Sequence, residues 1–340
     1  MSKVVVTGAT GFIGAHMVIK LLEAGHEVRA TMRNLSRADS MRQVYARQTD
    51  RLEGLEFAAL DLVKDEGWEE VMAGADYLIH MASPVPLQTP KSESDIIEPA
   101  RQGALRALKA AAGAGVKRVV LTSSVAAIMY GHDPGKTSFT ETDWSDPKSN
   151  DNSAYTRSKT LAERAAWEYV QKEEVDLELV TINPGLVLGP ILEADFGASA
   201  VVVKKLLEGA FPGTPKIGFP ITDVRDVVDL HLLAMTHSKA AGERFIAANG
   251  FMWMQDIAKI LKAKLPDASK KVPVKNLPNW LMRILANFDK EVKAVAFELN
   301  RYRQADGAKA TELLGWQPRS NEEAVTDCAE SLIAHKVLEG

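Results

Sequence analysis

The chain has 340 residues, of which 46% are apolar, a net charge of −4 and a single cysteine, Cys328. This length suits one large α/β domain or two unequal ones. The mixed charge argues against nucleic acid or an anionic membrane as an obligate partner, and one cysteine excludes an internal disulfide and a cysteine-rich zinc site. No apolar run approaches the roughly 18 residues of a membrane helix, and a lone cysteine fits a reducing compartment, so we expect a cytoplasmic protein without a membrane partner.

The first predicted element is an apolar strand over 4–6, which runs into a glycine-rich loop and then into a helix over 12–23. Glycine lets the backbone turn tightly and approach a ligand, because it has no Cβ. The helix N-terminus adds unpaired N–H groups and the positive end of a dipole. The glycine spacing departs by one residue from the G-x-G-x-x-G fingerprint, and a turn that only packs a helix on a sheet is the alternative. The loop predicts a pyrophosphate site made of Gly8, Thr10, Gly11, Phe12, Ile13 and Gly14.

Strands and helices alternate through the first half of the chain. This alternation is typical of an α/β fold with a doubly wound parallel Rossmann sheet and helices on both faces. After Pro184 the alternation loosens, although 219–235 is predicted to return to the sheet as a strand and a helix. We therefore expect a dinucleotide-binding domain over 1–184 plus 218–249, and a smaller, mainly helical substrate lobe over 185–217 plus 250–340. Further strands are predicted at 27–32, 55–60, 76–80, 117–124 and 177–182, and helices at 92–114 and 153–172.

The end of the second strand bears on which dinucleotide binds. An NAD site usually carries an acidic residue there, but this strand ends in Arg33, with Arg37 nearby. A guanidinium can grip a 2′-phosphate with two hydrogen bonds, so the arginines favour NADP(H). An ordinary solvated loop arginine is the alternative. After the third strand, Asp61 and Leu62 are candidates for the adenine ring, although an Asp that caps the next helix would look the same.

The helix predicted from Ser153 carries Tyr155 and Lys159, four residues apart and so on one face. A neighbouring ammonium, with the positive nicotinamide ring of the oxidised cofactor, would lower the pKa of the phenol from about 10 toward 7. Tyr155 would then be the general acid that protonates a carbonyl oxygen as hydride arrives. Such a pair is also common by chance on exposed helices. Asp151, Asn152 or Ser153 can cap this helix.

A run of hydroxyls, Thr122-Ser123-Ser124, stands at the end of the fifth strand. A hydroxyl at that position can hydrogen-bond the same carbonyl oxygen and stabilise its developing charge. A Ser/Thr turn that only caps the strand is the alternative.

Together the glycine loop TGATGFIG, the hydroxyl run TSS and the helix YTRSKTLAERAAWEYV resemble the extended short-chain dehydrogenases/reductases, and within them the dihydroflavonol-reductase-like carbonyl reductases. The resemblance covers almost the whole chain, including RATMRN, HMASP, TINPGLVLGP, DVRDVVDLHLLAM and LLGWQPRS. It implies that Ser124, rather than Ser123, is catalytic together with Tyr155 and Lys159, and that Arg33 selects NADPH. It also implies that Lys159 binds the nicotinamide ribose hydroxyls and that the pro-S hydride goes to the carbonyl carbon.

The resemblance implies further cofactor contacts after the later strands. Substrate-pocket walls are expected from 85–96, 126–132, 186–217 and the C-terminal lobe. Relatives of this kind often dimerise through the helices 92–114 and 153–172, so we expect a monomer or a homodimer. The implied contacts are Met81, Ala82, Ser83, Pro184, Leu186 and Ser199.

One position departs from the family pattern. Plant flavonoid reductases carry an Asn five residues after the catalytic serine, where this chain has Met129. A flexible thioether suits a plain apolar substrate better than a polyphenol. We therefore expect an aldehyde or a simpler ketone rather than a flavonoid.

The remaining motifs leave several functions open. The scattered histidines predict no metal site, and the absence of a G-x-S-x-G elbow excludes a hydrolase of that class. The Asp223-Arg225-Asp226 cluster is expected to be a salt-bridged strand–helix junction. An NADPH-dependent carbonyl reductase is the leading hypothesis. The alternatives are an NAD-dependent sugar-nucleotide epimerase or dehydratase, a hydroxysteroid-type dehydrogenase and a non-enzymatic dinucleotide sensor.

Overall fold

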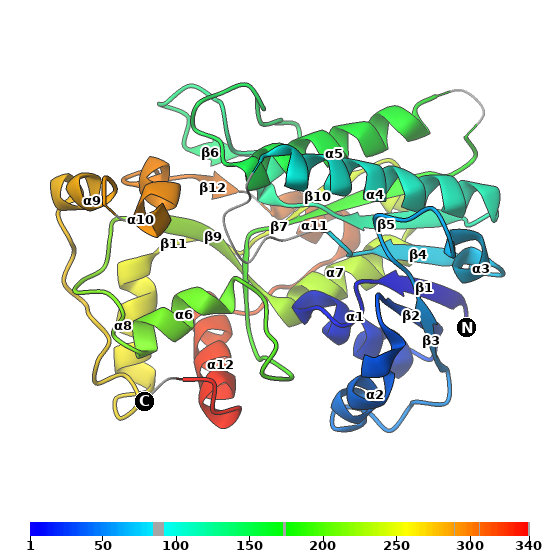
Figure 1. Ribbon diagram of the computed structural model, residues 1–340, viewed down its shortest axis with the longest axis horizontal. Coiled ribbons are helices and arrows are strands. Elements are labelled where there is room, and N and C mark those ends of the chain that lie inside the picture. Colours follow the sequence, from blue (N-terminus) through cyan, green and yellow to red (C-terminus); the bar gives the residue numbers. More distant parts are fainter. Residues whose placement is uncertain (84–91, 173–174, 289, 306, 339–340) are drawn as a thin grey trace.

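The computed structural model describes residues 1–83, 92–172, 175–288, 290–305 and 307–338. Seven parallel strands form one sheet in the order β3-β2-β1-β4-β5-β7-β10 (Figure 1). The strand order turns back between β1 and β4, which makes that crevice the topological switch point where ligands bind in such sheets. The predicted Rossmann sheet is therefore confirmed. Its strands are β1 (Lys3–Thr7), β2 (Glu27–Met32), β3 (Leu55–Ala59), β4 (Tyr77–His80), β5 (Arg118–Thr122), β7 (Glu178–Pro184) and β10 (Arg244–Ala247).

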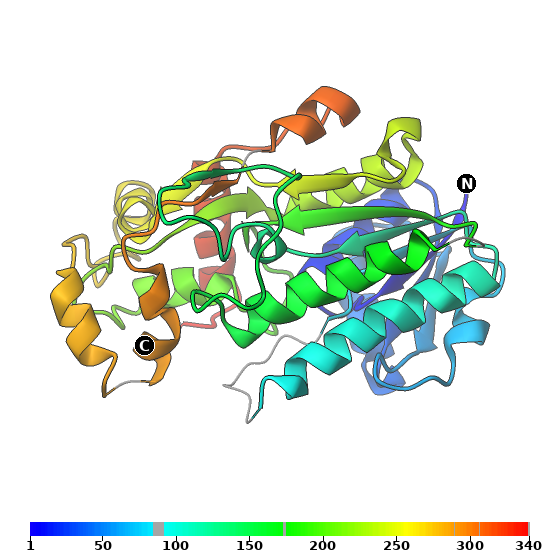
Figure 2. The same ribbon diagram turned by 90° about the horizontal axis from the view of Figure 1, so that it is seen from above.

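Helices cover both faces of this sheet. The helices α1 (Phe12–Glu23), α2 (Ala38–Ala46), α7 (Val224–Thr236) and α11 (Ala308–Leu314) pack on one face, and α3 (Trp68–Met72), α4 (Ser94–Gly113) and α5 (Ala154–Val170) on the other. In Figure 2 the cyan α4 and the green α5 run side by side along their face. In the described ranges no helix is both long and apolar enough to cross a membrane.

The first strand shows why the sheet needs both layers. Val4 and Val6 belong to the core under α1 and α7, whereas Val5 belongs to the core under α3 and α4. Side chains alternate between the faces of a strand, so a continuous run of valines fits only a strand buried on both sides. Each fully buried valine contributes about 1.5–3 kcal/mol of hydrophobic stabilisation.

A second body follows β7. Its three-stranded sheet has the order β11-β9-β8, and its core lies among α6, α8 and α12. The prediction that 219–235 returns to the large sheet as a strand and a helix is wrong for the strand, because β9 pairs with β8 and β11. The helix, α7, does pack on the large sheet, and β10 takes the position beside β7. The bounds are β8 (Leu186–Leu188), β9 (Gly218–Asp223), β11 (Phe251–Trp253), α6 (Ala200–Leu207), α8 (Met254–Lys264), α9 (Asn279–Leu285), α10 (Lys290–Val295) and α12 (Asn321–Ala334).

Short elements complete the chain. A small parallel sheet joins β6 (Ser138–Phe139) to β12 (Gln304–Ala305). Single turns of 3₁₀-helix follow several strands and helices. They are η1 (Leu35–Arg37), η2 (Val125–Ala127), η3 (Ser238–Ala240) and η4 (Ala296–Glu298).

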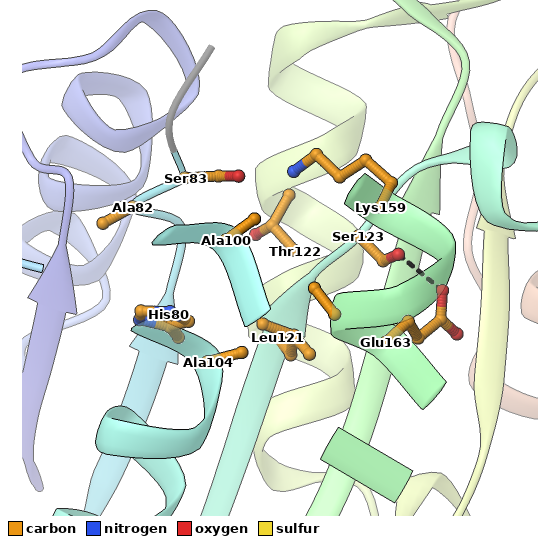
Figure 3. A pocket seen from close by; sticks show the side chains of 11 residues that line it. His80, Ala82, Ser83, Ala100, Ala104, Leu121, Thr122, Ser123, Lys159 and Glu163 are labelled. Carbon is orange, nitrogen blue, oxygen red and sulfur yellow. Dashed lines mark hydrogen bonds between the residues drawn. The ribbon is translucent and has the colours of Figure 1, made fainter. Parts of the chain in front are cut away.

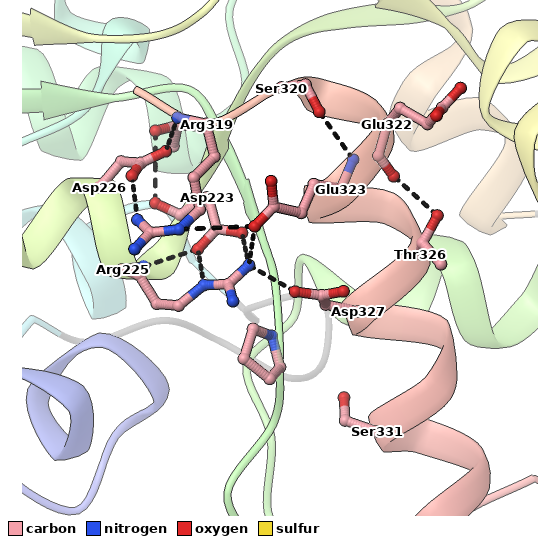
Figure 4. A network of polar contacts seen from close by, with 12 residues as sticks. Asp223, Arg225, Asp226, Arg319, Ser320, Glu322, Glu323, Thr326, Asp327 and Ser331 are labelled. Atoms are coloured by element: carbon pink, nitrogen blue, oxygen red, sulfur yellow. Dashed lines mark hydrogen bonds and ion pairs between the residues drawn. The ribbon is translucent and has the colours of Figure 1, made fainter. Parts of the chain in front are cut away.

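The acidic and basic cluster at the start of α7 ties the two bodies together (Figure 4). Asp223 caps α7 by accepting a hydrogen bond from the Arg225 amide, 2.8 Å away. The Arg225 guanidinium bonds Asp223 and, at 2.6 Å, Asp327 of α12. Asp226 accepts a hydrogen bond from the Arg319 amide at 2.7 Å. The predicted salt-bridged strand–helix junction is confirmed.

Three buried histidines predict how stability depends on pH. Burial lowers the pKa of His16 to about 4, of His80 to about 3 and of His231 to about 4. Their unfolded pKa is near 6.5, so between pH 6.5 and 4 the unfolded chain binds protons that the folded chain does not. We therefore expect the free energy of unfolding to decrease as the pH is lowered from 6.5 to 4, by about 1 kcal/mol per pH unit for each ring.

Denaturant unfolding at several pH values measures this slope. His231→Gln is the matched variant, because an amide can still bond Thr122 but cannot titrate. The variant should have a shallower slope between pH 6.5 and 4, and an unchanged slope would contradict the assignment.

Candidate active site

The predicted site residues gather where the parallel strands end. The glycine loop follows β1, Arg33 and Arg37 follow β2, and Asp61 and Leu62 follow β3. Met81, Ala82 and Ser83 follow β4, Ser124 follows β5, and Pro184 ends β7. Carboxyl ends of parallel strands share one edge of the sheet, so residues far apart in the sequence meet there.

The glycine loop is closed by contacts that only glycine permits. Gly8 has a positive φ of 72°. A Cβ on Gly14 would lie 2.1 Å from the Gly8 carbonyl oxygen, and one on Gly8 would lie 2.9 Å from the Ala82 nitrogen. The Thr7 hydroxyl accepts hydrogen bonds from the Met81 and Ala82 amides, both at 3.1 Å. The loop is thereby held against the end of β4, with Gly11 exposed at the N-terminus of α1.

The two arginines after β2 have different surroundings. Arg33 is exposed, and within the described ranges its side chain has no ion-pair or hydrogen-bond partner. Arg37 instead donates to both carboxylate oxygens of Glu193, at 2.8 and 2.9 Å, and to Asp195 at 3.0 Å. Both carboxylates belong to the segment between β8 and α6. The structure thus brings acidic partners to Arg37 that the sequence did not predict.

The residues after β3 have local packing roles. Asp61 accepts a hydrogen bond from the Val63 amide at 3.2 Å, as a turn-capping aspartate does. Leu62 packs against Gly103 of α4, where any Cβ would overlap the leucine side chain. A contact of Asp61 and Leu62 with adenine stays a prediction.

The start of α5 positions the candidate acid. Ser153 caps the helix in a reciprocal capping box with Thr156, which decides among the three predicted caps. Tyr155 and Lys159 lie on one face, and the Lys159 nitrogen is 5.9 Å from the centre of the Tyr155 ring. Lys159 is buried, and burial lowers its pKa to about 8 against the opposing effect of the Glu163 charge.

The three hydroxyls at the end of β5 separate into different roles. Thr122 bonds His231 at 2.8 Å, and Ser123 donates to Glu163 at 2.5 Å. Ser124 accepts from the Ala126 amide at 3.1 Å, and its hydroxyl lies close enough to the Tyr155 phenol to lower the pKa of that group. Of the three, it is therefore Ser124 that stands beside the candidate acid.

The expected lowering of the Tyr155 pKa by Lys159 and the oxidised nicotinamide ring stays a prediction, and burial of the phenol acts against it. Burial raises the pKa of the phenol, and the hydrogen bond with Ser124 only partly offsets this. The charges of Lys159 and of the oxidised nicotinamide ring favour the phenolate, whereas desolvation of the phenol, which depends on the fold, favours the protonated form. The phenol is consequently protonated at neutral pH, which is the state that a proton donor requires.

The sequence did not single out the carboxylate that organises this region. Glu163 is fully buried one helical turn after Lys159 and also accepts hydrogen bonds from Asn183 Nδ2 at 2.7 Å and Arg244 Nε at 2.7 Å. Asn183 also donates to the Ser124 carbonyl at 3.1 Å. The same four-residue spacing that joins Tyr155 to Lys159 joins Lys159 to Glu163, so the signal was present in the sequence.

A pocket lies between the ends of β4 and β5 (Figure 3). Its walls include Ser83, Thr122 and Ser123, and the Lys159 nitrogen points toward the side where Ser83 lies. Asn183 and Pro184 end β7, while Leu186 begins β8 and Ser199 precedes α6 without capping it. Of the expected pocket walls, 85–91 lie outside the described residues.

A second cavity, of about 580 Å³, lies between the chain after η2 and the segment around α9 and η4. Met129 lines it and is buried. Its other walls include His132, Lys136, Arg283 and Arg301, which makes the surroundings of Met129 more polar than its own side chain suggests. No group of three His, Cys, Asp or Glu side chains able to hold a metal ion occurs in the described part of the chain.

A family model described as the NAD dependent epimerase/dehydratase family matches residues 4–248, from β1 to just past β10. The chain belongs to this family. The predicted resemblance to extended short-chain dehydrogenases/reductases, and to their dihydroflavonol-reductase-like branch, is confirmed by the relatives described next.

Curated relatives are similar over most of the chain. Cinnamoyl-CoA reductase 1 of Petunia hybrida is 36% identical over 270 residues, covering 78% of each chain. An uncharacterized oxidoreductase of Schizosaccharomyces pombe is 34% identical over 282 residues, covering 78% of this chain and 83% of that one. Among solved structures, yeast methylglyoxal/isovaleraldehyde reductase Gre2 complexed with NADPH is 26% identical, with a TM-score of 0.81 over 99% of this chain and all of that one.

Proposed function

We propose that this protein is an NADPH-dependent reductase of aldehydes or ketones, able to run in either direction. One observation carries the proposal. Ser124, Tyr155 and Lys159 come together at the same sheet edge as a glycine loop built for a pyrophosphate. Relatives named as cinnamoyl-CoA reductase and as a methylglyoxal/isovaleraldehyde reductase support this assignment.

The residues present fit a dinucleotide. The backbone cradle at Gly8 and Gly14 leaves no space for a Cβ, and the N-terminus of α1 opens onto the exposed Gly11. We assign the pyrophosphate to this loop, the 2′-phosphate to Arg33 together with Arg37, and the nicotinamide end to the region of Ser83, Lys159 and Pro184. The cofactor, when bound, supplies the hydride.

The side chains of the chain supply the rest of the reaction. The Ser124 hydroxyl donates a hydrogen bond to the carbonyl oxygen of the substrate and stabilises the negative charge that develops there. Tyr155 gives its phenolic proton to that oxygen. Lys159 places a positive charge near the phenolate that remains and so stabilises it.

The surroundings of Met129 bear on the substrate. The buried thioether fits an aldehyde or a simple ketone, while polar groups across the same cavity suit a substrate with a polar end. The experiment that tests the function follows NADPH oxidation against aldehydes, α-diketones, aryl ketones and a dihydroflavonol. Turnover of aldehydes or simple ketones is the expected result, and no turnover of any carbonyl would overturn the proposal.

The alternative with NAD as a retained cofactor is less well supported. An epimerase or dehydratase of this family would keep its cofactor through purification and usually has an acidic residue at the end of β2, where this chain has Arg33. The hydroxysteroid dehydrogenase is tested by adding a ketosteroid to the same panel. Purified protein that carries bound NAD would favour the epimerase.

Arg33 yields a prediction about cofactor choice. We expect Arg33→Ala to raise the Kd for NADPH by about 10- to 100-fold, the value of a charge-assisted hydrogen bond, and to leave the Kd for NADH nearly unchanged. Titration of intrinsic fluorescence with each cofactor measures both constants. Arg47→Ala, a change at an exposed arginine at the end of α2, is the control. Equal losses for both cofactors would mean that Arg33 does not bind the phosphate.

We further propose that the enzyme acts in the cytoplasm as a monomer or a homodimer. Cys328 is the one cysteine of the chain and is buried, which fits a protein of a reducing compartment. The long helices α4 and α5 pack against each other and offer their outer surfaces as the dimer face. Sedimentation velocity at several protein concentrations distinguishes the two states.

A further inference from the structure

The segment between β8 and α6 links the C-terminal body to the cofactor half of the molecule. In Figure 1 it is the green loop that descends between α12 and α1. Its Gly197 packs against the Phe12 side chain in the first turn of α1, where a Cβ would lie 3.2 Å from the phenylalanine Cβ. Its Glu193 and Asp195 reach the start of α2 and hold Arg37. The segment therefore borders the glycine loop on one side and the arginines after β2 on the other.

Two acidic side chains occupy the two terminal nitrogens of the Arg37 guanidinium. One guanidinium nitrogen donates to both oxygens of Glu193, and the other donates to Asp195. Phosphate oxygens are recognised by the same planar fork of N–H donors. Glu193 occupies one terminal nitrogen of Arg37 and Asp195 the other, so a 2′-phosphate that bound the same guanidinium in a fork would compete with them.

The exposed fractions of the two acidic side chains show which of them binds Arg37 more strongly. The Glu193 side chain is 23% exposed and the Asp195 side chain 73% exposed. Ion pairs weaken with exposure because water and salt screen them. Burial and, after it, the charge of Glu193 raise the pKa of Tyr45, whose phenol donates a hydrogen bond to the Ala9 carbonyl of the glycine loop. Glu193 thus stands within the cofactor half of the molecule, although its sequence position is in the segment after β8.

We propose that Glu193 competes with the 2′-phosphate of the cofactor for Arg37 and thereby limits the preference for NADPH over NADH. This inference rests on the proposed function, since it needs a dinucleotide in this cleft. NADH has a hydroxyl in place of the phosphate and leaves the Glu193–Arg37 pair intact. NADPH must displace Glu193 to use Arg37, and part of the gain from the phosphate contact is lost in doing so.

The test measures cofactor affinity directly, so it needs no substrate. Kd values for NADPH and NADH are determined by fluorescence titration or calorimetry for the native chain, Glu193→Gln, Asp195→Asn, Arg37→Gln and the double variant Glu193→Gln/Arg37→Gln. We expect Glu193→Gln to lower the Kd for NADPH about fivefold, and either to leave the Kd for NADH unchanged or to raise it. In the Arg37→Gln background, Glu193→Gln should leave the Kd for NADPH unchanged. Asp195→Asn should act in the same direction but less.

Two other results have distinct meanings. If Glu193→Gln raises the Kd for both cofactors by the same factor, the Glu193–Arg37 ion pair only holds the segment between β8 and α6 in place, and the proposal is overturned. It is also overturned if the change in NADPH affinity persists in the Arg37→Gln background. Glu322→Gln, which removes an exposed ion pair with Lys264 at 2.7 Å in the C-terminal body, is the matched control and should alter neither affinity. A native chain that binds no dinucleotide would instead refute the proposed function itself.

Discussion

Tyr155→Phe is expected to lower kcat about 1,000-fold while NADPH still binds. The substitution removes only the phenolic oxygen, which donates the proton, and a positioned general acid contributes roughly 10²- to 10⁴-fold to a rate. The aromatic ring is kept, so the packing around Ser124 and Lys159 should persist. Steady-state kinetics with an active aldehyde, together with the Kd for NADPH, measure the two parts of the prediction.

The control for this variant is Tyr169→Phe. Tyr169 lies on the same helix, α5, and packs at the edge of the core under α3 and α4. The chemical change is identical, but this residue is remote from Ser124, and turnover should stay at the native value. A Tyr155→Phe enzyme with native turnover would refute the mechanism.

Glu163→Ala is expected to lower the free energy of unfolding by about 3–5 kcal/mol, the usual cost of leaving a buried charge unpaired. The Arg244 guanidinium is buried and bonds Glu163 through Nε. Ser123 and Asn183 lose the same acceptor, and Asn183 bonds the Ser124 carbonyl. Denaturant unfolding measures the loss. A change below about 1 kcal/mol, the level of an exposed pair, would contradict the prediction.

Glu163→Gln separates the charge from the hydrogen bonds and gives a readout if the alanine variant does not fold. The Glu163 charge raises the pKa of Lys159, which burial has lowered to about 8. The other described groups near the ammonium are the neutral His80 and the Tyr155 ring. Without the carboxylate the pKa of Lys159 should fall further, so activity that needs the ammonium should be lost at a lower pH. If activity declines at the same alkaline pH in the variant as in the native enzyme, Glu163 does not act through Lys159.

Local patterns in the sequence were enough to predict most of the dinucleotide-binding half. The valines of β1 are buried on both faces, as a continuous apolar run requires, and the glycines lie where backbone groups come within contact distance. Helix α5 begins at one of the three predicted caps, with Tyr155 and Lys159 on one face. The patterns that predict these features span fewer than ten positions each, which is why spacing and residue type were sufficient.

The prediction for β9 failed because two distant segments could fill the same position in the large sheet. Strand β9 was assigned to the large sheet, but β10 fills the position beside β7, and β9 pairs with β8 and β11. The burial that raises the pKa of Tyr155 likewise depends on the surrounding fold. Neither the strand pairing of β9 nor the burial of Tyr155 can be predicted from the hydrophobic periodicity of a short stretch of sequence.

The sequence by itself determined that the chain has a dinucleotide loop, an arginine rather than an acid after the second strand, and a tyrosine–lysine pair on one helix face. The resemblance to a family pointed to Ser124, but only the tertiary structure decided that Ser123 bonds Glu163 and that Glu193 holds Arg37 from 156 positions away. The physical reason is that residue type and spacing govern the local backbone and the faces of helices and strands. Which hydroxyl or charge meets which partner depends on how separate elements pack at the sheet edge.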